Sequence, residues 1–182
     1  MNSVSESYVL FSTPIGTCGI AWGERGVVAI QLPEASERET RVRMLRGRAN
    51  AREEQPPPHI QRGIDEIVAL LSGGENDLAN VQLDMRGVPD FHRRVYEIAR
   101  AIPVGDTSTY GSIATKLGDP TAARAVGQAL GRNPFPIVIP CHRVLAANGK
   151  LGGFSGGGGN ATKLRMLAIE GAQVRGELGL KP

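Results

Sequence analysis

The chain has 182 residues, of which 41% are hydrophobic and 21% are charged, and this composition is typical of a folded globular protein. No apolar run reaches the roughly 20 residues that span a bilayer, and no basic-then-apolar signal opens the chain, so we expect a cytoplasmic protein without a membrane segment. Two cysteines cannot form a disulfide framework, and we expect both to be free thiols.

The charge is distributed unevenly along the chain. Residues 1–86 contain 9 Lys/Arg and 12 Asp/Glu, a net charge of −3, whereas residues 87–182 contain 12 Lys/Arg and 6 Asp/Glu, a net charge of +6. A basic second half indicates a polyanionic partner. A solvated charged surface would give the same pattern, so charge alone leaves both interpretations open.

The first part of the chain predicts a small sheet with helices. Three extended runs separated by turns, residues 7–16, 17–26 and 27–33, are typical of a β-meander. The charged run 35–54 predicts a surface helix that frays, and the prolines of residues 55–59 interrupt regular structure.

An amphipathic helix is predicted over residues 60–74, followed by a short strand over 81–85. The apolar residues at helical spacing are Ile60, Ile64, Ile67, Val68 and Leu71. We place the domain boundary at residues 86–89, which gives domains of residues 1–86 and 87–182.

The second part is predicted to be mostly helical. Asp90 is expected to cap a helix over 91–102, and two short helices follow within 104–118 and 119–131. A tight turn joins these two helices, as in a helix-turn-helix, although any two packed helices look similar. The residues expected to face inward from the second of them are Ala125, Val126, Ala129 and Leu130.

The remaining chain predicts a turn and a buried strand over 132–140, then a glycine-rich loop over 145–160. A last helix over 161–171 is expected to place Leu164, Leu167 and Ala168 on one face and to stop at Gly171. The glycine-rich loop is a candidate for a wing or a lid.

Cys141 follows Pro140 directly, and His142 and Arg143 follow Cys141. An adjacent imidazole or cation favours the thiolate, so we expect a nucleophilic cysteine with a lowered pKa. Glu170 is the carboxylate that we place behind His142, because a general base needs an orienting partner. The alternative is a small buried cysteine beside a surface histidine.

Five short stretches of the second half occur together in one protein family. They read STYG, AARAVG, RNPFPI, IPCHRV and GGFSGG in chain order. With them, the chain resembles the O6-alkylguanine-DNA alkyltransferases, also called methylated-DNA–protein-cysteine methyltransferases, densely over residues 91–171 and more loosely in the STPIG run. The resemblance implies an α+β protein with a ribonuclease-H-like small sheet with helices, then a winged helix-turn-helix-like domain.

The resemblance also implies an activity. The protein would transfer the alkyl group of O6-alkylguanine, and less efficiently of O4-alkylthymine, from duplex DNA to Cys141, irreversibly and once per molecule. It would act as a monomer, without metal or cofactor, and would bind double-stranded DNA through the minor groove with the alkylated guanine flipped out.

Individual roles follow from the same resemblance. His142 would be the base, acting through a water molecule, with Glu170 behind it, and Asn133 would bridge the turn of the site to the helix-turn-helix. Tyr110 would protonate guanine N3 and help to rotate the nucleotide out. The residues expected to contact the DNA or the base are Arg124, which fills the gap in the duplex, Val144 through its backbone, Phe154, Ser155 and Lys163.

Three features depart from the family pattern. The glycine-rich loop is longer, Phe154 stands where tyrosine is frequent, and Tyr96 stands where tryptophan is common. Some family members bind a structural zinc, but Cys18, His59 and His92 have no ligand-like spacing, so no zinc is expected.

The alternatives come from other functional classes. A non-catalytic protein that flags alkyl damage for another pathway is disfavoured, since such relatives lack the cysteine. A transcriptional regulator with a Cys-rich module and a Cys-His hydrolase are the remaining alternatives.

Overall fold

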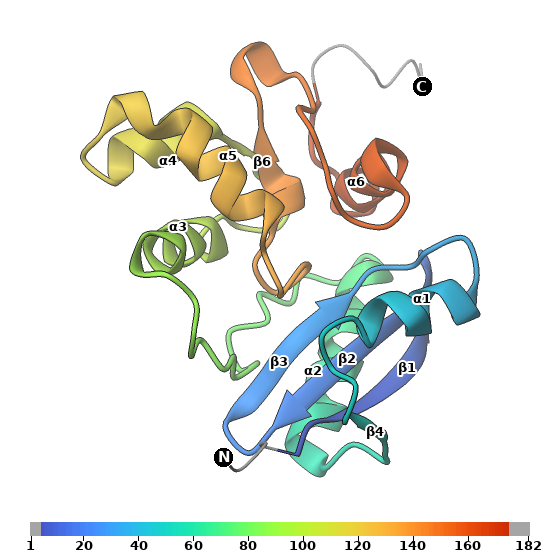
Figure 1. The fold of residues 1–182 in the computed structure, drawn as a ribbon. Helices are drawn as coiled ribbons and strands as arrows, with labels where there is room; N and C mark the ends of the chain where they lie inside the picture. The colour runs from blue at the N-terminus through green and yellow to red at the C-terminus, as the bar shows by residue number, and fades with distance from the viewer. Residues whose placement is uncertain (1–4, 175–182) are drawn as a thin grey trace.

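The computed structural model describes residues 5–174, so the ends of both predicted domains, residues 1–4 and 175–182, lie outside it. It combines a four-stranded mixed sheet with helices, which confirms the α+β class. Figure 1 shows the sheet with α1 and α2 in one half of the molecule and α3 to α6 in the other. Within the described residues, no helix is long and apolar enough to cross a membrane.

The predicted β-meander is present. Strands β1 (Ser7–Thr13), β2 (Gly16–Gly23) and β3 (Gly26–Gln31) pair antiparallel, and β4 (Arg52–Glu53) adds a short parallel strand beside β1. Because side chains alternate along a strand, each face of the sheet has its own buried set. Cys18, Ile20 and Trp22 face the main core, whereas Tyr8, Ala21 and Ala29 face a smaller cluster.

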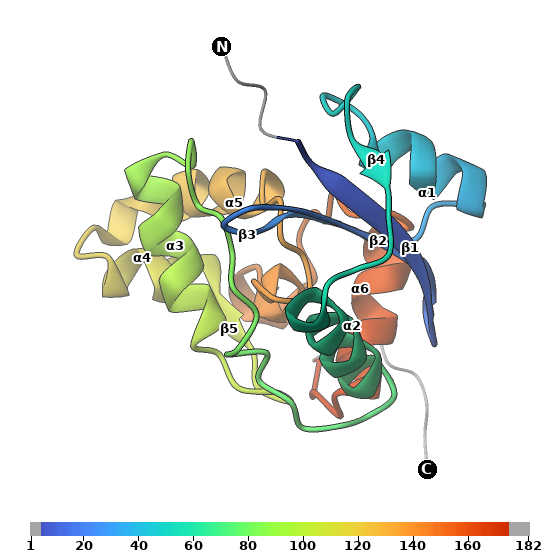
Figure 2. The same ribbon diagram turned by 90° about the horizontal axis from the view of Figure 1, so that it is seen from below.

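The two faces of the sheet are covered by α1 (Glu37–Met44) and α2 (Pro58–Leu71), which lie on opposite sides of it in Figure 2. Met44 of α1 packs in the smaller cluster. The predicted surface helix thus ends at Met44, well short of residue 54. Helix α2 begins at Pro58 rather than Ile60, because a proline is well tolerated in the first turn of a helix.

The segment 81–85 is not the strand that we predicted. It forms only one isolated parallel bridge, between Val27 and Leu83. The amide of Val27 donates to the carbonyl of Gln82 at 2.9 Å, and the amide of Asp84 donates to the carbonyl of Val27 at 2.8 Å. Further along β3, the amide of Ile30 donates to the carbonyl of Pro134 at 2.8 Å, so β3 also contacts the second half.

The second half contains the predicted pair of short helices. Helix α3 (Asp90–Arg100) precedes α4 (Tyr110–Lys116) and α5 (Ala123–Gly131), and a 3-10 turn at Pro120–Ala122 joins the last two. The predicted cap of α3 is wrong. Asp90 is the first residue of the helix, and the capping position is held by Pro89 without a side-chain bond.

Two predicted inward residues are exposed. Ala125 lies with Arg124 on the open face of α5, because Val126, Ala129 and Leu130 already occupy the buried face. In α6 (Gly159–Ile169), Ala168 is exposed, and the buried positions are Lys163, Met166 and Leu167. Gly171 ends this helix with a φ of 70°, as predicted.

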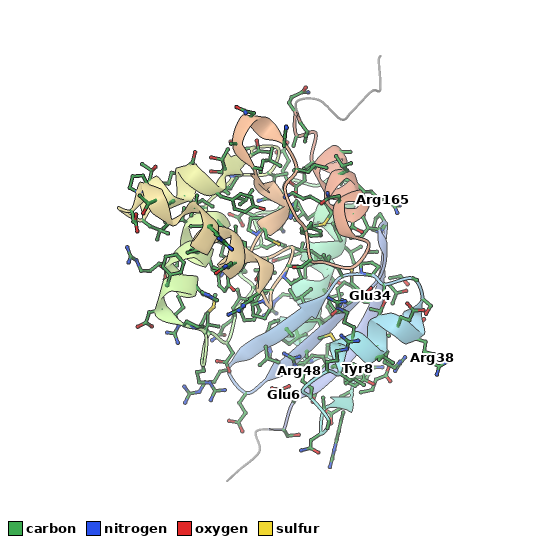
Figure 3. All side chains as sticks on the ribbon, turned by 45° about the horizontal axis from the view of Figure 1, so that its top comes forward. Glu6, Tyr8, Glu34, Arg38, Arg48 and Arg165 are labelled. Atoms are coloured by element: carbon green, nitrogen blue, oxygen red, sulfur yellow. The ribbon has the colours of Figure 1, made fainter. Side chains whose placement is uncertain are left out.

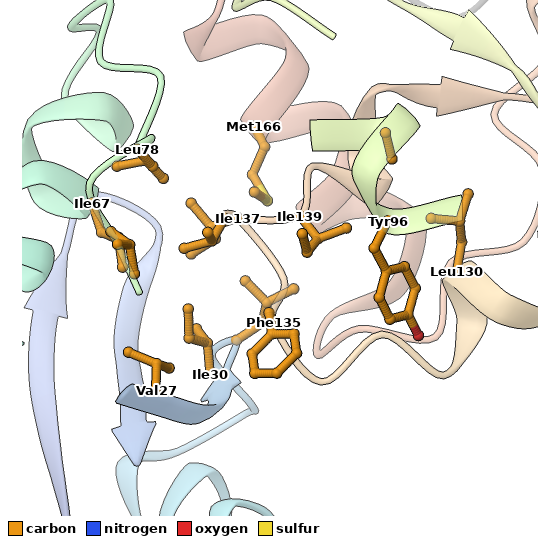
Figure 4. Close-up of a cluster of buried hydrophobic side chains, with 14 of the residues drawn as sticks. Val27, Ile30, Ile67, Leu78, Tyr96, Leu130, Phe135, Ile137, Ile139 and Met166 are labelled. Carbon is orange, nitrogen blue, oxygen red and sulfur yellow. The ribbon is translucent and has the colours of Figure 1, made fainter. Parts of the chain in front are cut away.

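Both halves share one hydrophobic core. Figure 4 shows Val27, Ile30, Ile67 and Leu78 from the first half beside Phe135, Ile137, Ile139 and Met166 from the second. The turn that precedes Cys141 is therefore part of the contact between the two halves.

Candidate active site

The turn before Cys141 replaces the buried strand predicted over residues 132–140. Ile137 has a φ of 76°, and the amide of Ile139 donates to the carbonyl of Phe135 at 2.8 Å. The prolines of this segment have no N–H group, so they cannot donate to a strand ladder. A β-branched residue in the left-handed region costs on the order of 1–3 kcal/mol, and such strain often occurs at functional sites.

The side chain of Asn133, which lies just after α5, stabilises this turn with two hydrogen bonds. Its Nδ2 donates to the carbonyl of Ile139 at 2.9 Å, and its Oδ1 accepts from the amide of Phe135 at 2.9 Å. Since one side chain bonds to both ends of the turn, it fixes the approach of the chain to Cys141, which opens a 3-10 turn at Cys141–Arg143.

His142 and Arg143 converge on one carboxylate. Nε2 of His142 lies 2.8 Å from Oε1 of Glu170, while Nε and one terminal nitrogen of Arg143 each donate to Glu170 at 2.9 Å. The other terminal nitrogen of Arg143 donates to the carbonyl of Ile102 at 2.7 Å. The side chain of Glu170 is only 3% exposed, so this is a buried charge network rather than a surface ion pair.

The protonation states follow from this geometry. Burial alone would raise the pKa of Glu170, but hydrogen bonds from His142 and Arg143 outweigh it and lower the pKa to about 2. Burial lowers the pKa of His142, although the bond to Glu170 opposes that change. An ionised carboxylate only accepts, so Nε2 of His142 carries the hydrogen and Nδ1 keeps a lone pair. That Nδ1 is buried and has no hydrogen-bond partner within residues 5–174.

Cys141 is partly buried and faces a cavity of about 250 Å³. Burial raises its pKa, while the side chain of Asn133 and the charge of Lys163 lower it by smaller amounts. The predicted lowering of the thiol pKa is therefore wrong for the resting protein. Neutral His142 supplies no positive charge beside the sulfur, so burial dominates.

The cavity brings together several of the predicted residues. Cys141, Asn133, Tyr110, Phe154 and Ser155 all line it. The cavity is also lined by residues of the first half that were not predicted as site residues, namely Ile30, Gln31, Leu32 and Arg43. No local motif marks these four residues, because only the packing of the two halves brings them to the cavity.

Lys163 lies behind the cavity rather than on its wall. Its fully buried ammonium donates to the carbonyls of Val144 and Leu151, both at 2.7 Å, and lies 5.8 Å from the ring centre of Phe154. Burial lowers its pKa to about 8. Lys163 thus ties α6 to β6 (Val144–Leu145), which pairs with β5 (Ser108–Thr109).

Tyr110 and Ser155 line the side of the cavity next to α5. The hydroxyl of Tyr110 donates to the carbonyl of Gly153 at 3.5 Å, and burial raises its pKa, so the phenol keeps its proton. Oγ of Ser155 donates to the carbonyl of Gly131 at 2.9 Å. Arg124 is exposed on α5 and does not line the cavity.

Tyr96 is buried, and its hydroxyl has a hydrogen-bond partner. Its hydroxyl donates to the carbonyl of Ala129 at 2.8 Å, and burial raises its pKa to about 12. The tyrosine hydroxyl therefore adds a hydrogen bond to the carbonyl of Ala129 in α5, where a tryptophan is common in the family. No group of three or more His, Cys, Asp or Glu side chains suited to a metal occurs within residues 5–174.

Comparisons with known proteins identify the family of this chain. Residues 90–172 match the family model described as 6-O-methylguanine DNA methyltransferase, DNA binding domain. A methylated-DNA–protein-cysteine methyltransferase of Methanothermobacter thermautotrophicus is 36% identical over 164 residues, which cover 90% of this chain and 85% of that protein. The relative of that name from Mycobacterium tuberculosis is 42% identical over 124 residues, 68% of this chain and 73% of that protein.

The fold is also similar to solved structures. The crystal structure of Mycobacterium tuberculosis OGT in complex with DNA superposes with a TM-score of 0.73 at 36% identity. The superposition covers 91% of this chain and 92% of that one, so the likeness extends over both halves.

Proposed function

Because the chain belongs to the methylated-DNA–protein-cysteine methyltransferase family, we propose that Cys141 is its alkyl acceptor. The protein is an enzyme of DNA repair that works by alkyl transfer. The observation that carries the assignment of Cys141 is its position on the cavity wall beside the His142–Glu170 network. Cys18, the other thiol, is fully buried in the first half, and burial raises its pKa to about 12.

In the proposed reaction, His142 removes the thiol proton when a substrate is bound. The free lone pair on Nδ1 is the acceptor, and a water molecule bridges it to the sulfur, while Nε2 donates to Glu170. The carboxylate stays ionised and stabilises the imidazolium that forms, because its pKa lies near 2. The raised pKa of Cys141 fits this order, since the thiolate arises only at the moment of reaction.

The transfer itself is a displacement at carbon. The sulfur attacks the alkyl carbon, the S–C bond forms, and the C–O6 bond breaks with its electron pair left on the guanine. Tyr110, whose raised pKa keeps the phenol protonated, gives the leaving guanine a proton at N3 and recovers one from solvent. His142 then releases its proton, and the thioether remains on Cys141. Because nothing regenerates the thiol, each molecule acts once.

The DNA component of the proposal is supported by the relative solved with DNA and by the exposed face of α5. An O6-alkyl group lies inside the base stack, so the nucleotide has to rotate out to meet a cysteine in a cavity. Exposed Arg124 and the small Ala125 suit a helix that lies in the minor groove, with the arginine filling the gap. We propose that one protein molecule binds each lesion and that O4-alkylthymine reacts more slowly.

The test is intact mass spectrometry after mixing with a duplex that contains a single O6-methylguanine. One methyl group should appear on Cys141 and none on Cys18, with no second turnover. Cys141→Ser should bind the duplex without gaining mass, and Cys18→Ser is the matched control that should react normally. Binding of the damaged duplex by the wild type with no gain in mass would favour the non-catalytic damage-binding alternative.

A further inference from the structure

The glycine-rich loop of the cavity has little means of holding its own position. Residues 156–159 are four consecutive glycines, and Gly158 and Gly159 both have positive φ values, of 74° and 56°. Glycine loses more conformational freedom on ordering than any other residue. The position of the cavity wall at Phe154–Gly157 therefore depends on contacts with other parts of the molecule.

Close packing contacts of this loop come from the first half. A Cβ atom on Gly157 would lie 2.1 Å from the carbonyl oxygen of Pro33, and one on Gly156 would lie 2.7 Å from Cδ1 of Leu32. The loop thus lies directly against the segment between β3 and α1. Only glycine permits this approach.

Arg43 of α1 supplies a polar contact to the same loop. One terminal nitrogen of Arg43 donates to the carbonyl of Ser155 at 3.4 Å, and its Nε lies 3.2 Å from Oε1 of Glu34. The Nε2 of Gln31 donates to the same oxygen of Glu34 at 3.3 Å. Glu34 therefore orients the guanidinium, and Figure 3 shows Glu34 at the junction of the two halves.

The second half also holds the loop through a hydrogen bond. Oγ of Ser155 donates to the carbonyl of Gly131 at the end of α5, and the carbonyl of Ser155 accepts from Arg43. Ser155 is consequently held between α5 of the second half and α1 of the first. With either bond removed, Ser155 keeps a hydrogen bond to only one of the two halves.

We propose that Arg43, oriented by Glu34, is a positioning residue for alkyl transfer. It fixes the glycine-rich loop from the first half and so sets the wall against which the flipped base is held. This inference rests on the proposed function, because it concerns the cavity that contains Cys141. The first half then contributes to the reaction geometry through Arg43, Leu32 and Pro33, without touching the reacting atoms.

The test compares two variants that disturb two different contacts between the loop and the first half. Arg43→Gln removes the contact to Ser155 from the α1 side, and Gly157→Ala pushes the loop off Pro33. Arg38→Gln is the matched control for the first, since Arg38 is exposed on the outer side of α1 in Figure 3. Gly63→Ala is the control for the second, since its Cβ would make only an ordinary 3.5 Å contact with Val81.

Two quantities are measured for each variant: the alkylation rate with free O6-benzylguanine and amide hydrogen exchange of residues 153–158. Free base is used because it needs no nucleotide flipping. Arg43→Gln and Gly157→Ala should each slow alkylation roughly tenfold, as expected for a misplaced substrate, and should speed exchange in this loop alone. The double variant should be little slower than either single one, because both act through the same displacement.

The results separate this inference from the proposed function. If the wild type does not alkylate Cys141, the proposed function fails. If the wild type reacts but Arg43→Gln reacts equally fast, the positioning role is overturned whatever happens to exchange. A slower rate with exchange raised throughout the chain would also overturn it, since Arg43 would then act on global stability.

Discussion

The two halves of the molecule place their charged side chains in opposite ways. In the first half, Arg41 pairs with Glu37 and Glu53 at the surface, where these side chains are 34%, 62% and 48% exposed. In the second half, Glu170 and Arg143 pair while only 3% and 5% exposed.

This difference indicates where the chemistry lies. Burying an ion pair costs desolvation energy that its attraction often fails to recover. A buried network with both carboxylate oxygens of Glu170 engaged therefore need not stabilise the fold more than apolar packing would, but it is well suited to fixing the protonation state of His142. The exposed pairs of the first half add little to stability.

The largest expected effect is on the buried carboxylate. Glu170→Gln should lower the single-turnover rate by about one to three orders of magnitude, because the imidazolium loses its counter-charge. Stopped-flow alkylation with a duplex containing O6-methylguanine measures this rate. Glu53→Gln, which changes an exposed carboxylate of the first half, should leave it unaltered. An unchanged rate in Glu170→Gln would remove His142–Glu170 from the mechanism.

The second largest effect should be on the pH dependence of the free energy of unfolding. The folded pKa of Glu170 is about 2 against an ordinary 4.5, so its contribution is complete above pH 4.5 and is lost as the pH falls through 2. The shift corresponds to about 3 kcal/mol of unfolding free energy. Urea unfolding across this range should show the loss in the wild type and a flatter profile in Glu170→Gln. Parallel profiles would mean that the carboxylate is not ion-paired in the folded protein.

Removal of the buried cation Lys163 should lower the free energy of unfolding by less than the loss of the Glu170 charge does. Lys163→Met keeps the apolar stem but leaves the carbonyls of Val144 and Leu151 without their donor. Each unsatisfied carbonyl costs roughly 1–3 kcal/mol, partly offset by removal of a buried charge, so we expect a net loss of about 2 kcal/mol. Urea denaturation at neutral pH measures it. Lys150→Met, at an exposed position, should stay within about 0.5 kcal/mol of wild type.

Arg124, an exposed arginine of the second half, tests whether an exposed side chain can still contribute to the rate of repair. Arg124→Ala should slow repair of duplex DNA roughly tenfold, the scale of one lost contact, and leave reaction with free O6-benzylguanine unchanged. The reason is that only the duplex requires a group to fill the gap. Arg62→Ala is the exposed control in the first half. Equal losses on both substrates would mean that Arg124 acts through the fold.

The smallest effect should come from the surface pair of the first half. Arg41→Gln should cost less than about 1 kcal/mol of unfolding free energy, because exposed ion pairs contribute little. The loss should shrink further at high salt. Chemical denaturation at two salt concentrations measures both values. A loss as large as that of Lys163→Met would show that the contrast between the halves does not hold.

The fold was predictable where a short-range pattern has a single explanation. The extended runs 7–16, 17–26 and 27–33, separated by turns, predict the strands, and the spacing of Ile60, Ile64 and Ile67 predicts a helix. The apolar run 137–139 does not form the strand that its β-branched residues predict, because three nearby prolines lack the donors that a strand requires. Two-residue β4 has no pattern long enough to detect.

The candidate site was predictable only in part. Cys141, His142 and Asn133 belong to short stretches that identify the family, so their positions could be named from the sequence. The thiol pKa could not, because it depends on burial and on His142 being neutral. The contact of Arg43 with the loop could not be predicted from the sequence either, since only packing between the halves brings Arg43 to Ser155.

The bonds made by β3 affect how the first half would behave alone. Val27 uses both its backbone groups on the segment 82–84, and Ile30 donates to Pro134 from the second half. These contacts occupy the outer side of a terminal strand that otherwise invites pairing with another chain. A fragment of residues 1–86 would keep the bonds between Val27 and residues 82–84. It would lose the bond from Ile30 to Pro134 and would expose the apolar surface that packs against Phe135 and Ile139. We expect such a fragment to self-associate, because part of its strand edge and this apolar surface would be exposed.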